Sequence, residues 1–179
     1  MKQTPATDTE SKQLGKGMII AAWLLLLGML IWFFNTQLEQ QHNPNQQVMT
    51  AMTADGQPEV RLERNRFGHY VATGLINSQP VVFMLDTGAT DVSVPLPVAE
   101  RLGLEKGQAV QYQTANGTIR AWQTVIDEIR LGDLSIGPVR ASINPGDQGD
   151  EILLGMSFLK HLDFEQQGNT LTLKPPTGN

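Results

Sequence analysis

The chain has 179 residues, of which 40% are apolar and 17% charged, and its formal net charge is −5. This composition permits a folded core, and it lacks the clustered lysine and arginine of a nucleic-acid-binding protein. The absence of cysteine excludes disulfides, thiolate nucleophiles and cysteine-ligated zinc sites. The histidines His42, His69 and His161 share no metal-ligand spacing, so we expect no metal site.

Met18 to Phe34 form an uncharged and almost wholly apolar run. Its length is at the short end of what spans a bilayer as a helix, and Trp32 and Phe33 near its end resemble an interfacial aromatic belt. The alternative is a buried core helix, but such a helix normally carries polar residues on one side. We therefore predict a transmembrane helix over residues 18–34.

The residues around this run indicate an uncleaved signal anchor rather than a cleaved signal peptide, because no small-x-small cleavage site follows it. Lys2, Lys12 and Lys16 precede the run, whereas the next lysine or arginine after it is Arg61. The positive-inside rule then places the N-terminal segment, residues 1–17, in the cytoplasm and the rest of the chain on the other side of the membrane.

The chain after the apolar run falls into a polar stretch and a β-rich domain. Residues 35–58 begin with many asparagines and glutamines and are predicted to form a poorly ordered linker. From residue 59 to residue 174, short strand-like runs alternate with turn signals, which predicts one all-β domain, followed by a tail over residues 175–179. Strands are predicted over residues 60–65, 69–76, 81–86, 91–94, 109–115, 118–130, 151–154, 162–165 and 170–174, a hairpin over residues 131–143, and helical turns over residues 98–104 and 156–161.

The motif Asp86-Thr87-Gly88 follows an apolar strand. An Asp-x-Gly at the end of a strand is commonly an ordinary turn, in which the carboxylate accepts a hydrogen bond from the backbone ahead of it. Here, however, the strand leads the carboxylate toward a dry interior, where a lone charge is costly. Gly88, Ala89 and Thr90 are small enough to let a second backbone approach. A separate apolar-apolar-glycine unit, Leu153-Leu154-Gly155, occurs farther along the chain.

Taken together, these segments resemble a known family. Leu85-Asp86-Thr87-Gly88-Ala89-Thr90, with Ile152-Leu153-Leu154-Gly155 farther on, is similar to the retroviral-type aspartic proteases, the retropepsins, and to their single-lobed cellular and bacterial relatives. The resemblance covers roughly residues 60–174 and implies a single-lobed, retropepsin-like β-barrel with one or two short helices. It implies that Asp86 is the catalytic residue. The residues that it implies as support for the active-site loop are Thr87, Gly88, Ala89, Thr90, Leu153, Leu154 and Gly155.

An Asn-Gly pair between two strand-like runs predicts a hairpin after residue 109. In the family, a hairpin between the two motifs forms a flap over the substrate. The resemblance therefore makes Tyr112, Thr114, Asn116 and Gly117 candidates for covering a substrate. An ordinary surface hairpin is the alternative, and the residues themselves do not decide between the two.

The chain departs from the viral pattern at two positions. Viral members often carry an acidic residue at the position of Thr90 and an arginine at the position of Met156, and the two form an internal ion pair. That pair is absent here, so we expect the Asp86 loop to have apolar or hydrogen-bonded support. This departure weakens any transfer of viral dimer details, but not of the catalytic aspartate.

The mechanism that the resemblance implies needs two carboxylates, one ionised to activate a water and one protonated to donate to the scissile carbonyl. The chain has a single Asp-Thr-Gly, and Asp133, Asp147, Asp150 and Asp163 lie in turn, loop or hairpin settings. We therefore expect two copies of the chain to meet at Asp86 about a two-fold axis.

The resemblance and the charge bias together imply an aspartic endopeptidase anchored in the inner membrane of a bacterium, with its protease domain in the periplasm. It would act as a homodimer on peptide or protein substrates, without a metal or organic cofactor. The alternative is a tethered binding or assembly module that keeps the fold without turnover, although a pure binder has no need for the acid at Asp86.

Overall fold

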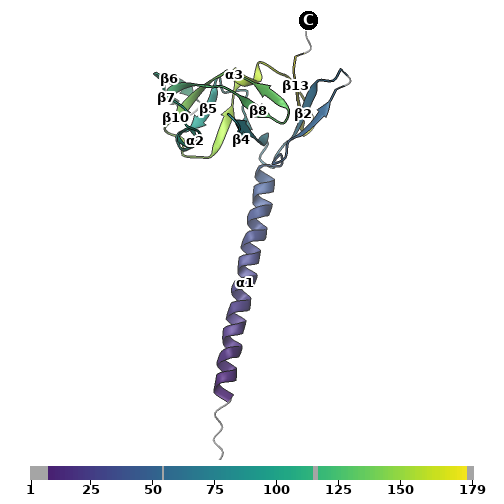
Figure 1. Ribbon diagram of the computed structural model, residues 1–179, viewed down its shortest axis with the longest axis vertical. Helices are drawn as coiled ribbons and strands as arrows, with labels where there is room; N and C mark the ends of the chain where they lie inside the picture. The colour runs from purple at the N-terminus through teal and green to yellow at the C-terminus, as the bar shows by residue number, and fades with distance from the viewer. Residues whose placement is uncertain (1–7, 54, 115–116, 177–179) are drawn as a thin grey trace, which may run out of the picture. The chain divides into compact units, whose positions relative to one another are not determined.

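In this computed structural model, helix α1 spans Asp8–His42 and includes the predicted membrane segment. Within α1, Lys16–His42 is long and apolar enough, by length and composition, to cross a membrane. The helix ends just before Pro44, whose ring and missing N–H cannot continue a helix. The structure describes residues 8–53, 55–114 and 117–176, and the chain divides into two compact units between Glu39 and Gln40 (Figure 1).

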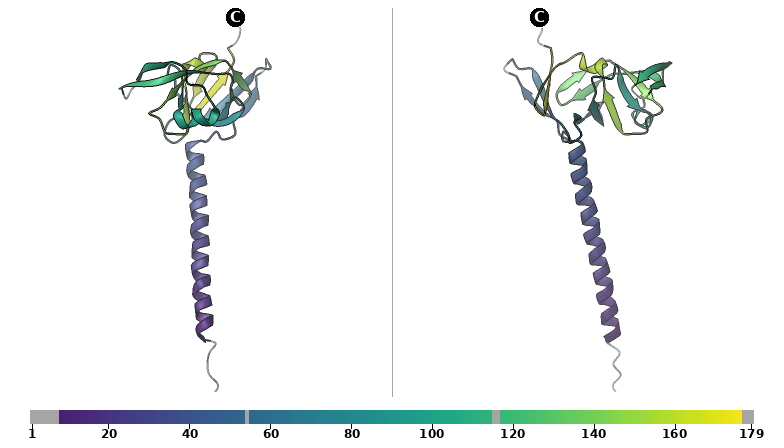
Figure 2. Two further views of the ribbon diagram at one scale, coloured as in Figure 1. Left: turned by 60° about the vertical axis from the view of Figure 1, so that its left-hand side comes forward. Right: turned by 180° about the vertical axis from the view of Figure 1, so that it is seen from behind.

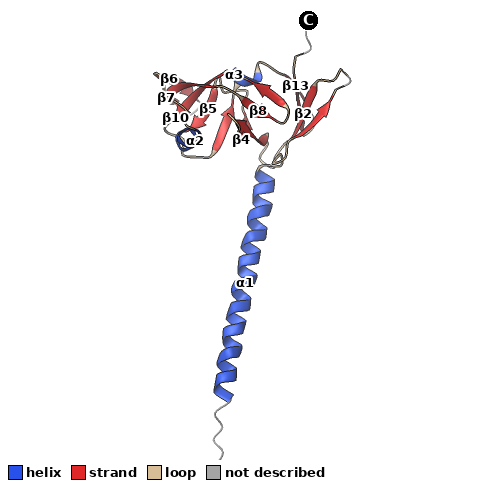
Figure 3. Ribbon diagram, viewed as in Figure 1, coloured by secondary structure: helices blue, strands red, loops and turns tan. Residues whose placement is uncertain are grey.

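The second unit consists mainly of strands, drawn in red in Figure 3, which confirms the predicted β-rich fold. Within the described residues, the strands form a four-stranded antiparallel sheet in the order β1-β2-β13-β12 and a nine-stranded sheet in the order β6-β7-β10-β5-β11-β4-β3-β8-β9. Two hairpins, β6–β7 and β1–β2, lie at opposite ends of this unit in every view (Figures 1 and 2). The bounds are β1 (Met49–Met52), β2 (Pro58–Glu63), β3 (Val71–Ile76), β4 (Gln79–Leu85), β5 (Val92–Pro95), α2 (Leu96–Leu102), β6 (Ala109–Thr114), β7 (Gly117–Ile126), β8 (Ile129–Leu131), β9 (Leu134–Ile136), β10 (Val139–Asn144), β11 (Glu151–Leu154), α3 (Met156–Leu159), β12 (Asp163–Gln167) and β13 (Thr170–Lys174).

Turn residues set several of these boundaries. Helix α2 ends at Gly103, whose left-handed φ of 68° closes the helix, and Gly168, with a φ of 61°, occupies the turn between β12 and β13. The strand predicted over residues 118–130 is divided into β7 and β8. The division arises because the backbone N–H of Glu128 donates to Asn77 Oδ1 and its carbonyl accepts the Asn77 N–H, each at 3.0 Å.

The hydrophobic core joins the two sheets. Val60 and Leu173 of the four-stranded sheet share one buried cluster with Phe83, Ile152 and Phe158, and all five are fully buried. Strand β2 alternates buried and exposed residues, as a strand with one face on the core does. Burial of such side chains, at roughly 1.5–3 kcal/mol each, holds β4, the strand that leads to Asp86, in place.

Strand β11 lies between β4 and β5 in the larger sheet. It runs parallel to β4, with Leu154 opposite Leu85, and meets β5 in antiparallel fashion where Leu153 lies opposite Ser93. The chain therefore leaves β4, passes through the loop that begins with Asp86, and returns as β5 on the other side of β11. This arrangement brings the two sequence motifs together.

The close passage of β11 requires a glycine at its end. A Cβ at Gly155 would lie 2.3 Å from the carbonyl oxygen of Asp91 and 2.7 Å from that of Ala89, both backbone atoms. The next residue, Met156, donates its backbone N–H to the same Ala89 carbonyl at 2.8 Å. The contact thus provides a partner for one of the free N–H groups at the start of α3.

Residues 35–58 depart from the predicted poorly ordered linker, because they contain the end of α1, strand β1 and a buried asparagine. The side-chain amide of Asn45 donates to the carbonyls of Glu63 at 2.9 Å and Val71 at 2.7 Å, and its oxygen accepts the Glu63 N–H at 2.7 Å. The Asn45 carbonyl also accepts the Thr73 N–H at 3.0 Å. Asn45 therefore forms an isolated parallel β-bridge with Ala72 of β3.

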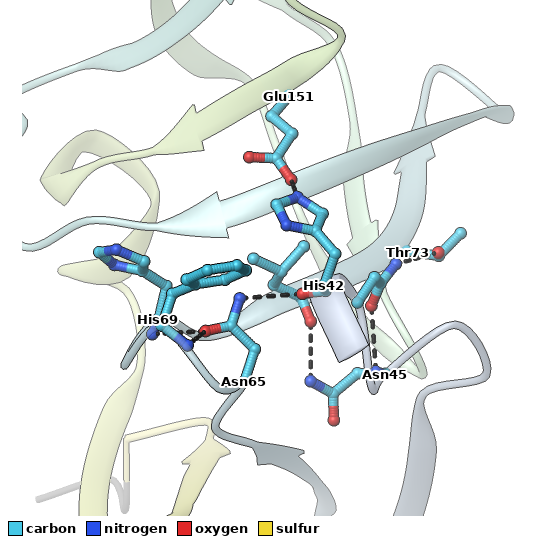
Figure 4. Close-up of polar contacts among 9 residues, drawn as sticks. His42, Asn45, Asn65, His69, Thr73 and Glu151 are labelled. Carbon is cyan, nitrogen blue, oxygen red and sulfur yellow. Dashed lines mark hydrogen bonds and ion pairs between the residues drawn. The ribbon is translucent and has the colours of Figure 1, made fainter. Parts of the chain in front are cut away.

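The neighbouring residues add further polar contacts to the domain (Figure 4). His42 Nε2 contacts the carboxylate of Glu151, and Asn65 Nδ2 donates to the His42 carbonyl at 2.9 Å. Asn43 donates to the Thr73 hydroxyl at 3.0 Å. Polar side chains that looked like linker composition in the sequence thus bond to the domain, Asn45 to backbone groups and Asn43 and His42 to side chains.

We predict that Asn45→Ala lowers the free energy of unfolding of the domain by about 3 kcal/mol, because it leaves several buried backbone groups without a partner. The matched change is Gln47→Ala, two residues away at an exposed position, which should cost less than about 0.5 kcal/mol. Chemical denaturation of the full chain in detergent measures both. Equal, small effects would show that this stretch behaves as a free linker.

We also predict that Gly155→Ala lowers the free energy of unfolding by more than about 3 kcal/mol, because the new methyl group would collide with two backbone carbonyls. Gly146→Ala serves as the control, since a Cβ there meets the Asn144 side chain at an ordinary 3.4 Å. A thermal unfolding midpoint that is the same for both variants would contradict the close approach of β11.

Candidate active site

Asp86 is the first residue after β4 and lies half-buried in a tight loop. Its backbone N–H donates to the Leu154 carbonyl at 3.2 Å, and its own carbonyl accepts the Ala89 N–H at 3.2 Å. Its carboxylate oxygen Oδ1 accepts the Gly88 N–H at 2.8 Å. Among the described residues, the second oxygen, Oδ2, has no hydrogen-bond partner. The loop therefore fixes the carboxylate through one oxygen and leaves the other available.

Ser157 joins this loop to the strands behind it. Its backbone N–H donates to the Thr90 carbonyl at 2.9 Å. Its buried hydroxyl accepts the Val92 N–H at 3.0 Å and donates to the Arg140 carbonyl at 2.7 Å. Ser157, at the start of α3, thus joins the end of the Asp86 loop through its backbone and β5 and β10 through its side chain.

A buried carboxylate lies five residues beyond Asp86. The side chain of Asp91 is only 6% exposed, and its Oδ1 accepts a hydrogen bond from Arg140 Nε at 2.7 Å. Its other oxygen, Oδ2, accepts the phenol of Tyr112 at 3.2 Å. Partial burial of the phenol and the charge of Asp91 raise the pKa of Tyr112 above its ordinary value, and the Asp91 carboxylate raises the pKa of Arg140.

This ion pair is not among the sequence-based expectations. The family's pair at Thr90 and Met156 is absent, and the contacts that hold the Asp86 loop are hydrogen bonds, but Asp91 and Arg140 form an ion pair directly after the loop. Asp91 was overlooked among the aspartates, although it is more buried than Asp86. The only local signal was an aspartate placed directly before the apolar alternation of β5.

The structure brings part of the predicted site together. The backbones of Gly88, Ala89 and Leu154 hydrogen-bond to Asp86, and Gly155 lies against the Ala89 carbonyl. Leu153 is half-buried between β4 and β5, whereas the side chains of Thr87 and Thr90 are exposed.

The predicted flap corresponds to the β6–β7 hairpin. Thr114 ends β6, and Gly117 begins β7 with a φ of 110°. Asn116 lies outside the described residues. Tyr112 on β6 reaches Asp91, so this hairpin contacts the segment that follows the Asp86 loop.

The chain is similar to a protein family, to curated proteins and to solved structures. Residues 72–161 match the model of the family described as "gag-polyprotein putative aspartyl protease". A Sinorhizobium protein, "Uncharacterized protein in cobV 5'region", is 28% identical over 158 residues, which are 82% of this chain and 68% of that protein. The uncharacterized protein RP867 of Rickettsia prowazekii (strain Madrid E) is 29% identical over 105 residues, 57% of this chain and 45% of its own length.

Among solved structures, the crystal structure of a retropepsin-like aspartic protease from Rickettsia conorii is similar to this chain. It is 28% identical, with a TM-score of 0.57, and the alignment covers 72% of this chain and 96% of that one. The family match spans half of the chain and includes both the Asp86 loop and Gly155. The chain belongs to the retropepsin-like aspartic protease family.

Proposed function

We propose that the protein is an aspartic endopeptidase and that Asp86 supplies one of its two catalytic carboxylates. The observation that carries the proposal is the Asp86 loop itself. Its backbone is held by β11, its Oδ1 is fixed by the Gly88 N–H, and its Oδ2 has no hydrogen-bond partner among the described residues. A carboxylate held in this way need not reorganise when it takes a proton from a water.

An Asp-x-Gly turn alone would not support this proposal, because the chain contains a second one. In Asp147-Gln148-Gly149, the Gly149 N–H donates to Asp147 Oδ1 at 2.8 Å, the same distance as in the Asp86 turn. Both aspartates are partly buried, but the Asp147 N–H bonds within its own loop, to the Asn144 carbonyl, whereas the Asp86 N–H bonds to the Leu154 carbonyl at the end of β11. The setting distinguishes the two turns, not their local geometry.

The proposed reaction needs a second carboxylate. One ionised carboxylate takes a proton from a water, which attacks the peptide carbonyl carbon, while a protonated carboxyl donates its proton to the carbonyl oxygen. Asp91 does not suit this role, because Arg140 and Tyr112 engage its two oxygens. The partner that fits is Asp86 of a second copy, so the proposed active form is a homodimer.

The apolar part of α1 supports membrane anchoring of this enzyme. The proposed arrangement is a single span with residues 1–17 in the cytoplasm and the protease domain in the bacterial periplasm, as the lysine distribution favours. Two copies confined to one membrane meet at a high effective concentration, so even weak association of the domains suffices. The substrates would be peptides or proteins, and the reaction requires no metal or organic cofactor.

We expect Asp86→Asn to reduce peptide cleavage by at least about a thousandfold while leaving the fold and the unfolding midpoint unchanged, because the amide preserves the acceptor for Gly88 but cannot exchange the proton. Asp147→Asn, in the matched turn, should leave cleavage within about twofold of wild type. A broad peptide library, assayed between acidic and neutral pH, supplies the substrates. If wild type cleaves nothing in this library, the tethered binding or assembly module is favoured instead.

If two chains share one active site, we expect Asp86→Asn chains to lower the activity of the wild-type chains with which they pair. When wild type and Asp86→Asn are mixed in equal amounts in detergent and co-reconstituted, cleavage per wild-type chain should fall to about half, because mixed pairs have one competent carboxylate. With Asp147→Asn as the diluting chain, cleavage per competent chain should not fall. Cleavage per wild-type chain that is unaffected by Asp86→Asn would contradict the shared site.

A further inference from the structure

The β6–β7 hairpin extends beyond the strand that supports it. Strand β10 pairs with β7 over Trp122–Ile126, whereas β6 pairs with β7 from Ala109 opposite Trp122 as far as Thr114 opposite Gly117. The outer half of the hairpin, Gly117–Ala121 with the facing part of β6, therefore continues past β10. Tyr112 lies in this outer half, opposite Ile119.

The hydrogen bond from Tyr112 to Asp91 indicates that this outer half leans back over the sheet. In strand order, β6 is separated from β5 by β7 and β10, and Asp91 directly precedes β5. Strands lie about 4.8 Å apart and side chains stand roughly perpendicular to a sheet, so in a flat sheet these two residues would be about 14 Å apart. Their oxygens are 3.2 Å apart, so the hairpin must curl toward the segment that follows Asp86.

The acceptor of this hydrogen bond is well suited to hold the β6–β7 hairpin in place. Asp91 is buried and is held from the other side by Arg140, whose side chain is 60% exposed and is anchored on β10. Burial and the nearby carboxylate raise the pKa of Tyr112, so its phenol remains protonated and able to donate well beyond neutral pH. A hydrogen bond to a charged acceptor is stronger than one between neutral groups.

We propose that Asp91 is a positioning residue, which fastens the β6–β7 hairpin over the Asp86 loop through Tyr112 and is itself held in place by Arg140. The proposal rests on the proposed function and on the expectation, implied by the family resemblance, that this hairpin covers a bound peptide. It adds that the position of the hairpin is set by a side chain of the segment following the catalytic loop. The same segment would thus carry the reacting carboxylate and the contact that holds the cover above it.

Amide hydrogen exchange tests the fastening without any substrate. Tyr112→Phe removes the phenol and keeps the ring and the Asp91–Arg140 pair. In the full chain in detergent, we expect exchange in the outer half of the hairpin to become about tenfold faster, since the lost bond has a charged acceptor. The control is Tyr70→Phe, which removes a buried hydroxyl with no partner among the described residues and should leave the exchange of the hairpin unchanged.

A double-variant comparison isolates the contact itself. In the Asp91→Ala background, Tyr112→Phe should no longer change the exchange rate of the hairpin, because the acceptor is already gone. Equal exchange of the hairpin in wild type and Tyr112→Phe would overturn the proposal. A tenfold effect that persists without Asp91 would overturn it too, because Tyr112 would then act through another group.

Steady-state kinetics of Tyr112→Phe distinguish a loss of hairpin positioning from a loss of folded enzyme. If the hairpin orders over the peptide, Tyr112→Phe should raise KM about tenfold and change kcat less than twofold, whereas loss of folded enzyme lowers the apparent kcat at constant KM. The second pattern would refute a positioning role. If wild type cleaves no peptide, the proposed function fails, and the exchange experiment by itself decides whether Asp91 fastens the hairpin.

Discussion

The passage of β11 between β4 and β5 is the constraint on which the rest of the site depends. It is possible because Gly155 has no side chain, so that the carbonyls of Ala89 and Asp91 approach its α-carbon closely. Carbonyls of this loop that turn inward need donors, because unpaired buried backbone groups are costly. Met156 and Ser157 of α3 donate their N–H groups to the carbonyls of Ala89 and Thr90, and the Leu154 carbonyl accepts the Asp86 N–H. The orientation of one carboxylate is thus fixed by backbone contacts between two distant segments.

Two carboxylates in the same segment have different surroundings. Asp91 is buried, and both of its oxygens are engaged, one by a guanidinium and one by a phenol. A buried charge is tolerated only with such partners, and here most of the Arg140 side chain remains in water, which limits the cost of desolvation. Asp86 keeps one oxygen without a partner among the described residues. A structural role, for Asp91, and the proposed chemistry, for Asp86, are therefore divided between two aspartates.

Local patterns predicted most of the fold because its turns have strong chemical signatures. Gly103 and Gly168 adopt left-handed conformations that other residues avoid, and the apolar alternation of the strands marks their buried faces. The contacts that were missed are long-range pairings of polar residues. Asp91 and Arg140 are 49 positions apart, and nothing in either local sequence requires the other. Asn45 was missed for the same reason, since its amide bonds to backbone groups that any sequence would provide.

The asparagine contacts also change how the proposed dimer should be understood. A free linker of the predicted length would let each domain explore a wide volume, and effective concentration would then fall with the reach of the tether. Asn43 and Asn45 instead tie the chain to the domain directly after α1 ends, which removes much of that slack. For two anchored copies, the meeting of two Asp86 loops would then depend less on the length of the tether. It would depend more on how many copies share a membrane and on how well their domain surfaces fit each other.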